Sequence, residues 1–245
     1  MKATTTTYAL AATAALLLLS LYAGYVSAAP GGASIIFNET AGVPTTTPSN
    51  RSDARGTITT IILDSVQQDQ QWKAYVGNIT GKLSLDDAAG NTIYDWALAG
   101  VNKSGEVYVT RHASPNWANI SCASASNITV EEEFHNMTAT QTDSISSTFS
   151  VLSHAAFYVG TTPIGNNTCP STATYVSSLA QTLDGTQVFQ ELILRDNADQ
   201  IIFTTLVTGN YSGFDDLSYD FQIIVPESDV KTEPTLYYFF TELSG

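Results

Sequence analysis

The chain has 245 residues, of which 43% are hydrophobic, so it can form one large or two small packed domains and is not expected to be disordered. Only 9 Lys and Arg stand against 23 Asp and Glu, and the resulting net charge of −14 argues against nucleic acid as a partner. Charged residues make up 13% of the chain, so uncharged polar groups must hydrate most of its surface.

The first 28 residues have the pattern of a secretory signal peptide, in which a helical apolar stretch precedes a cleavage site. Lys2 precedes an apolar stretch that begins at Tyr8, and the small residues Val26-Ser27-Ala28 follow it. We expect cleavage after Ala28 and an extracellular or cell-surface location. An uncleaved anchor is the alternative, since the stretch is long enough to span a bilayer, and membrane contact would then be limited to this segment.

Residues 29–56 are expected to form an extended arm. The arm contains an apolar island, Ala33–Phe37, and continues into a Pro-, Thr- and Ser-rich linker over residues 41–56. A single short strand cannot bury itself, so the island has to dock on its own domain or on another subunit. The predicted assembly strand consists of Ile35, Ile36 and Phe37.

Residues 57–245 are expected to form one all-β domain, an antiparallel β-sandwich of immunoglobulin-like or jelly-roll-like type. Short runs rich in β-branched and aromatic residues alternate with turn signals every eight to twelve residues or so. The predicted strands include residues 127–135 and 144–152. The last run, TLYYFFTEL at 235–243, is expected to be a central or covered strand, because an exposed edge of this composition would invite aggregation.

Cys122 and Cys169 are the whole cysteine complement. Neither lies in a Cys-x-x-Cys context, so a disulfide is the simplest expectation for an exported chain.

Asn-x-Ser/Thr triplets are far more frequent than chance. They include nine of the thirteen asparagines, whereas about three would be expected from the Ser and Thr content. We therefore predict dense N-glycosylation of a protein surface, with N-linked glycans supplying hydration that charges do not. The candidate sites are Asn38, Asn50, Asn78, Asn102, Asn119, Asn127, Asn136, Asn166 and Asn210.

The stretch ASNITVEEEFHNMT, residues 125–138, concentrates carboxylates and a histidine. In a strand, Glu131, Glu133 and His135 would share one face with Asn127, and a glycan there would make that face the wet one. The opposite face, with Ile128, Val130 and Phe134, would then point to the core. We interpret the acids as a solvated face; a Ca²⁺ site is the alternative.

Two other acidic segments resemble cation loops. DDAAGN at residues 86–91 lacks the ligand spacing of an EF-hand loop and is interpreted as a hairpin turn. GFDDLSYD at residues 213–220 is interpreted as a solvated acidic loop, with a cation site as the alternative. No metal and no cofactor are predicted.

No catalytic motif is present. The histidines are His112, His135 and His154, and the sequence has no nucleophile elbow, no His-Glu-x-x-His and no phosphate loop, so we do not expect an enzyme. Paired carboxylates for sugar chemistry stay open because their partners can be distant in sequence. The tryptophans Trp72, Trp96 and Trp117 are expected in the core, and a sugar-stacking platform is the alternative.

The signal peptide, dense triplets, tethered island and β-sandwich pattern together resemble exported cell-surface glycoproteins of archaea. They are similar to archaeal filament subunits in which a β-sandwich lends an N-terminal strand to its neighbour. This resemblance implies self-assembly by strand addition, with Ile35, Ile36 and Phe37 on the next subunit. The chain departs from archaeal type IV pilins, whose short basic leader precedes the hydrophobic segment. Alternative functions are a surface adhesin or glycan-binding module and, third, a secreted carbohydrate-active enzyme.

Overall fold

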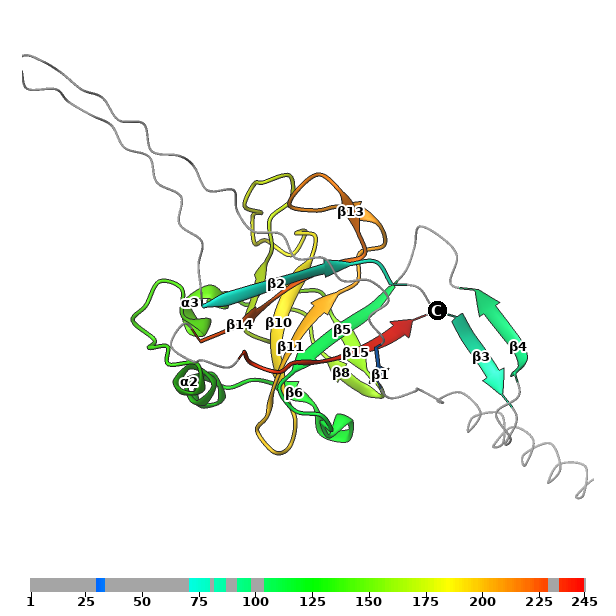
Figure 1. Cartoon of the computed structure of the whole chain (residues 1–245), viewed down its shortest axis with the longest axis horizontal. Helices are drawn as coiled ribbons and strands as arrows, with labels where there is room; N and C mark the ends of the chain where they lie inside the picture. Colours follow the sequence, from blue (N-terminus) through cyan, green and yellow to red (C-terminus); the bar gives the residue numbers. More distant parts are fainter. Residues whose placement is uncertain are drawn as a thin grey trace, which may run out of the picture.

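The computed structural model describes residues 30–33, 71–79, 82–86, 92–97, 104–228 and 234–244 (Figure 1). The expected signal peptide, most of the arm and residues 57–70 lie outside these ranges. The strands are β1 (Gly31–Gly32), β2 (Trp72–Gly77), β3 (Lys82–Asp86), β4 (Thr92–Ala97), β5 (Ser104–Thr110), β6 (Ser121–Cys122), β7 (Phe157–Val159), β8 (Thr162–Ile164), β9 (Ser171–Ala173), β10 (Gln190–Arg195), β11 (Ile201–Leu206), β12 (Tyr211–Ser212), β13 (Ser218–Tyr219), β14 (Phe221–Pro226) and β15 (Tyr238–Ser244). The helices are the 3-10 turn η1 (Trp117–Asn119), α2 (Ala125–Phe134) and α3 (Ile145–Thr148). The predicted all-β fold class is confirmed.

A seven-stranded antiparallel sheet forms the centre of the fold. Its order is β1-β15-β5-β11-β10-β6, and β9 also pairs with β10. The contact between β5 and β15 runs the full length of both strands, from Thr110 opposite Tyr238 to Ser104 opposite Ser244. β15 is therefore a covered strand over part of its length, because β1 pairs with its outer edge.

Both faces of the central strands are buried. Successive side chains of β5, β10 and β11 alternate between two cores, as a pleated strand requires. One core contains Val107, Val109, Ile193, Ile201 and Phe203, and the other contains Tyr108, Leu192, Leu194 and Ile202. Burying each such side chain contributes roughly 1.5–3 kcal/mol to the stability of the folded state. Strands buried on both faces therefore carry apolar residues at successive positions.

Different elements cover the two faces, and this gives the fold its sandwich-like form. The first core is closed by β14, by its partner β2 and by α2 and α3, through residues such as Ile223, Val225 and Ile145. Figure 1 shows β2 and β14 passing across the sheet, with α2 and α3 beside them. The second core is closed by η1 and by the β7–β8 hairpin, which contributes Phe157, Val159 and Ile164.

A buried carboxyl group joins the two layers. The Glu191 side chain on β10 accepts a hydrogen bond from the backbone N–H of Ile224 on β14, at 2.9 Å. Burial raises the pKa of Glu191 well above its usual value, because the charged form is disfavoured away from water. A neutral carboxyl can occupy this position without the cost of a buried charge.

The prediction of a strand at residues 127–135 is wrong, because this segment is the helix α2. Ser124 caps its first turn, accepting from the Asn127 N–H, and the Asn127 side chain accepts from the Ser124 N–H at 2.9 Å. At the other end Asn136 adopts a left-handed φ of 59°, and the Met137 N–H reaches back to the Glu132 carbonyl at 2.8 Å. Local capping at both ends thus outweighs the β propensity of Ile128, Thr129 and Val130.

Because residues 125–134 form a helix and not a strand, the side chains that are buried differ from those predicted. Glu131, Glu132 and His135 are buried, whereas Val130 is 64% and Phe134 40% exposed. The predicted solvated face is therefore wrong for Glu131 and His135 and holds only for Glu133. The predicted strand at 144–152 is also wrong, since Ile145–Thr148 form α3 and only Val151 makes an isolated bridge, to Ser171.

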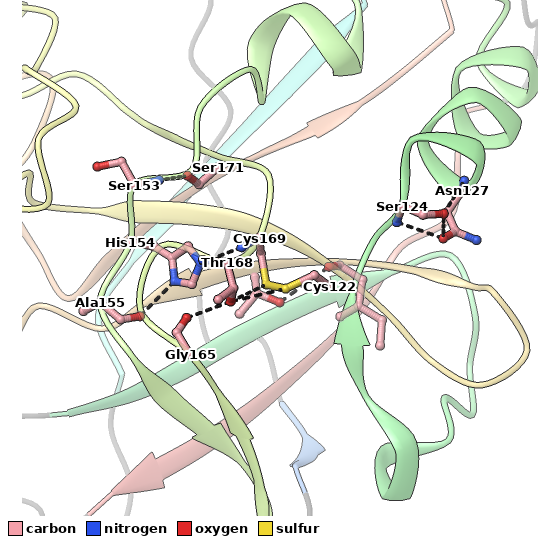
Figure 2. Close-up of a disulfide and its surroundings, with 12 residues drawn as sticks. Cys122, Ser124, Asn127, Ser153, His154, Ala155, Gly165, Thr168, Cys169 and Ser171 are labelled. Carbon is pink, nitrogen blue, oxygen red and sulfur yellow. Dashed lines mark hydrogen bonds between the residues drawn. A yellow bond between two sulfur atoms is a disulfide. The ribbon is translucent and has the colours of Figure 1, made fainter.

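Cys122 and Cys169 form the predicted disulfide, which joins β6 to the loop before β9 (Figure 2). It closes a separation of 47 residues. A loop of this length corresponds to about 4 kcal/mol of stabilisation in the chain-entropy model.

His154 organises the chain beside this disulfide (Figure 2). Its Nε2 accepts hydrogen bonds from the Thr168 and Cys169 N–H groups at 3.0 and 2.9 Å, so the ring proton resides on Nδ1, which faces the Ala155 carbonyl. Burial lowers the pKa of His154, which keeps Nε2 free to accept. The role of this histidine is structural.

None of the helices in the described part of the chain has the length and apolar character needed to span a bilayer.

Candidate assembly site

The outer edge of β15 binds the N-terminal arm by main-chain pairing. Gly31 lies opposite Thr241 and Gly32 opposite Phe240, and the Ala33 N–H donates to the Phe239 carbonyl at 3.0 Å. A Cβ added to either glycine would meet nothing within 4 Å, so this edge has room for a β-carbon at both positions. The edge of β15 is thus an acceptor for an added strand.

The predicted assembly residues Ile35, Ile36 and Phe37 lie outside the described residues. They begin two positions beyond Ala33, which is the last described residue of the arm. The structure therefore places the start of the arm at β15 directly before the apolar island.

A pair of carboxyl groups lies between β15 and its inner neighbour. Glu242 on β15 is directly opposite Glu106 on β5, and the Gly160 N–H donates to both oxygens of Glu242 at 3.0 Å. The Tyr108 hydroxyl donates to the same carboxylate at 3.2 Å. Burial and the neighbouring Glu242 raise the pKa of Glu106 to about 8, so Glu106 is mostly protonated at pH 7.

A pocket of about 350 Å³ lies elsewhere, between β2, β9 and β14. Tyr75, Thr174, Tyr175 and Phe214 are among its lining residues, and none of the described residues that line it carries a carboxylate or an imidazole. Beside it, Phe214 stacks on Tyr219 with ring centroids 6.5 Å apart, and Tyr175 and Phe214 are 54% and 47% exposed. The described lining of this pocket therefore offers apolar and aromatic contacts to a ligand. The carboxyl groups of Glu106 and Glu242 lie elsewhere, between β5 and β15.

The predicted core role of the tryptophans is confirmed for two of them. Trp72 packs against Phe149 with centroids 6.2 Å apart, and Trp117 packs between Tyr108 and Phe240 at 5.2 Å from each. The side chain of Trp96, on β4, lies outside what the structure describes.

The inner face of α2 is held by an ion pair. Arg111, which follows β5, donates through Nε and Nη2 to the two oxygens of Glu131 at 2.7 and 2.8 Å. The Nε2 atom of His135 lies 3.2 Å from Glu131 and 3.4 Å from the Tyr237 hydroxyl. Burial alone would raise the pKa of Glu131, but hydrogen bonds from Arg111 and His135 outweigh burial and lower it to about 2.

Within the described ranges, no group of three or more His, Cys, Asp and Glu side chains could hold a metal ion. Asp215 accepts from the Leu217 N–H and the Tyr219 hydroxyl, so it shapes a turn. Asp86, the first residue of DDAAGN, ends β3, which pairs with β4, and residues 87–91 lie outside the described residues. His112 is partly exposed beside Arg111, and burial together with that cation lowers its pKa.

Five of the six candidate glycosylation sites in the described part of the chain are exposed. They are Asn78, Asn119, Asn136, Asn166 and Asn210. Asn127 differs, since it is only 8% exposed, and its Nδ2 donates to Asp199 at 3.1 Å. Asn38, Asn50 and Asn102 lie outside the described residues.

Comparison with protein-family models, with curated proteins and with solved structures finds no match to this chain. The function is therefore argued from the geometry.

Sequence reasoning missed Arg111, Glu106 and Glu242. Glu106 is in phase with Tyr108 along β5, and Glu242 is in phase with Phe240 along β15. A carboxylate in phase with a buried aromatic residue is a detectable signal of an inward-facing acid. The partner of Arg111 had no such signal, because residues 127–135 were expected to form a strand.

Replacing Glu131 by Gln should lower the free energy of unfolding by about 3 kcal/mol at pH 7, because Arg111 loses a buried charge partner. The folded-state pKa of Glu131 is about 2 against an ordinary 4.5, so its stabilisation is present above pH 4.5 and is lost as the pH falls to about 2. Urea unfolding across this range measures both effects.

Glu133→Gln is the matched control, because Glu133 is an exposed carboxylate on the same helix. It should change stability by less than about 0.5 kcal/mol. Equal losses in the two variants would contradict the assigned role of the Arg111–Glu131 pair.

Glycopeptide mapping of the exported protein should find glycans at the exposed sites and none at Asn127, whose amide nitrogen is already hydrogen-bonded. Asn116 is exposed but outside any triplet, and it serves as an internal negative control. High occupancy at Asn127 would mean that the Ser124–Asn127 cap does not form in the mature protein.

Proposed function

We propose that this chain is an exported, densely N-glycosylated structural protein of the cell surface, which assembles into a filament or lattice through its N-terminal strand. The observation that carries the proposal is the main-chain pairing of β1 with the outer edge of β15. Strand addition of this kind supplies affinity through backbone hydrogen bonds and specificity through alternate side chains. The architectural resemblance to archaeal filament subunits points the same way.

An arm that binds β15 within one chain can bind the same edge of a second copy. Residues 34–70 separate β1 from the next described segment, and a fully extended chain of that length reaches on the order of 100 Å. Exchange of an identical element makes no new type of contact, so it adds little enthalpic cost. The long linker therefore supports arm exchange between subunits.

The disulfide and the exposed Asn-x-Ser/Thr triplets support an extracellular location for the protein. The Cys122–Cys169 disulfide suits an oxidising compartment, and exposed Asn-x-Ser/Thr sites occur on several separate loops. Glycans at these sites would add hydration to a chain with few charged residues.

Deleting Ala33–Phe37 should convert the assembled protein into a folded monomer, because the strand that enters the neighbour is removed. Size-exclusion chromatography with light scattering measures the mass, and circular dichroism checks the fold. Deleting Pro44–Pro48 removes the same number of residues from the linker and should leave assembly intact. Unchanged oligomers in the Ala33–Phe37 deletion would rule out assembly by this strand.

A second candidate function is glycan binding at the pocket between β2, β9 and β14. The exposed Phe214, stacked on Tyr219 beside Tyr175, is the specific observation that favours it, because aromatic faces stack on sugar rings.

On a glycan array, Phe214→Ala should lower binding at least fivefold relative to the unchanged protein if this second function holds. Leu152→Ala removes an equally exposed apolar side chain away from the pocket lining and is the control. A flat response of the unchanged protein would eliminate glycan binding.

A further inference from the structure

Two carboxyl groups face each other across the boundary between β5 and β15. Glu106 on β5 is directly opposite Glu242 on β15, and like charges at such positions weaken the pairing of two strands. Figure 1 shows β15 between β5, which is buried on both faces, and the two-residue strand β1. The carboxyl pair therefore lies where a strand near the edge of the sheet joins its buried centre.

Glu106 is enclosed by the protein. Its side chain is 5% exposed, and its Oε2 atom has no hydrogen-bond partner among the residues that the structure describes. Within the same residues, no ion pair includes Glu106. The titratable groups that act on it are Glu242 from β15 and, along its own strand, Tyr108, whereas Leu206, its neighbour on β11, is uncharged. A negative charge on Glu106 would thus be buried without a compensating cation.

Glu242 is held in place opposite Glu106. The N–H of Gly160, in the turn between β7 and β8, donates to both of its oxygens at 3.0 Å, and the Tyr108 hydroxyl donates to Oε2 at 3.2 Å. Burial raises the pKa of Tyr108, so this hydroxyl keeps its proton and stays a donor. The main chains are also close, since a Cβ added to Gly105 would lie 2.2 Å from the Glu242 carbonyl oxygen. Glu242 cannot turn away from Glu106 without losing these hydrogen bonds.

We propose that this carboxyl pair makes the attachment of β15 to β5 sensitive to pH, so that β15 stays paired while Glu106 is protonated and separates from β5 more often when Glu106 ionises. β5 is packed between two cores, whereas β15 has only the short β1 on its other side in the described sheet, so β15 is the strand that moves. These contacts all lie within one chain. The inference therefore goes beyond the proposed function and stands whether or not the chain assembles.

The direction of the effect follows from proton linkage. In the paired strand the pKa of Glu106 is about 8, whereas a carboxyl exposed by opening returns towards the ordinary value of 4.5. Between these two pH values opening releases a proton, so the open fraction of β15 rises with pH, by up to about tenfold per pH unit. Above about pH 8 the carboxyl is ionised in both forms, and the dependence ends.

Hydrogen exchange of peptides that cover residues 234–244 measures the opening of β15, once each rate is divided by the intrinsic exchange rate at the same pH. In the unchanged protein the open fraction should rise at least about tenfold from pH ~5.5 to pH ~7.5. Glu106→Gln keeps the shape of the protonated carboxyl but cannot ionise, so its open fraction should change by less than about twofold over this range. Circular dichroism checks that the variant is folded.

Glu191→Gln is the matched control, because Glu191 is another buried carboxyl with a raised pKa but lies on β10, away from β15. This variant should keep the rise in β15 opening. A flat response of the unchanged protein would overturn the proposal without reference to any variant, and so would a full rise in Glu106→Gln. An equal loss of the rise in both variants would mean that β15 exchanges by unfolding of the whole chain, which would also overturn it.

Discussion

The fold depends on the burial of both faces of β5, β10 and β11. A sheet buried on two sides needs a cover on each side, and here the covers differ: β2, β14 and two helices on one face, η1 and the β7–β8 hairpin on the other. The disulfide ties the second cover to β6, and the carboxyl group of Glu191 ties the first cover to β10. The central strands are therefore held by covers on both faces and do not depend on contacts at the edges of the sheet. An edge strand such as β15 can accept another strand without disturbing them.

An open strand edge is a hazard that proteins manage by covering it. β15 is rich in aromatic residues, and its own arm covers three of its positions with Gly31, Gly32 and Ala33. Glycines make a weak cover because they contribute no side-chain packing. In the proposed assembly, a neighbour's arm takes the place of this cover on the same edge.

Charged residues are few, and three of the cations in the described part of the chain form ion pairs. Arg111, Lys73 and Arg195 each bind a carboxylate, and Arg111 also lies 3.5 Å above the Phe134 ring. Burial raises the pKa values of two other interior acids, Glu106 and Glu191. Buried carboxyl groups in the described part of the chain are thus held in different ways: Glu131 is paired with a cation, Glu106 and Glu191 have raised pKa values, and Glu132 accepts from the N–H and hydroxyl of Ser146.

Much of the fold could be predicted from the sequence because it is encoded locally. Short runs rich in β-branched and aromatic residues predicted the all-β fold class, and a single pair of cysteines predicted the disulfide. The helix α2 could not be predicted in this way, because its buried face is polar: Glu131, Glu132 and His135 give no apolar period of 3.6 residues. Glu131 can be buried because Arg111 donates hydrogen bonds to it, and Glu132 because Ser146 does. Both donors lie outside the helix, so no pattern within residues 125–134 indicates them. The same holds for the candidate site: the sequence by itself indicated a tethered apolar strand, whereas only the tertiary structure decided that β15 is the edge that receives the arm. Gly31 and Thr241 pair although they lie near opposite ends of the chain, so no local sequence pattern can indicate their pairing.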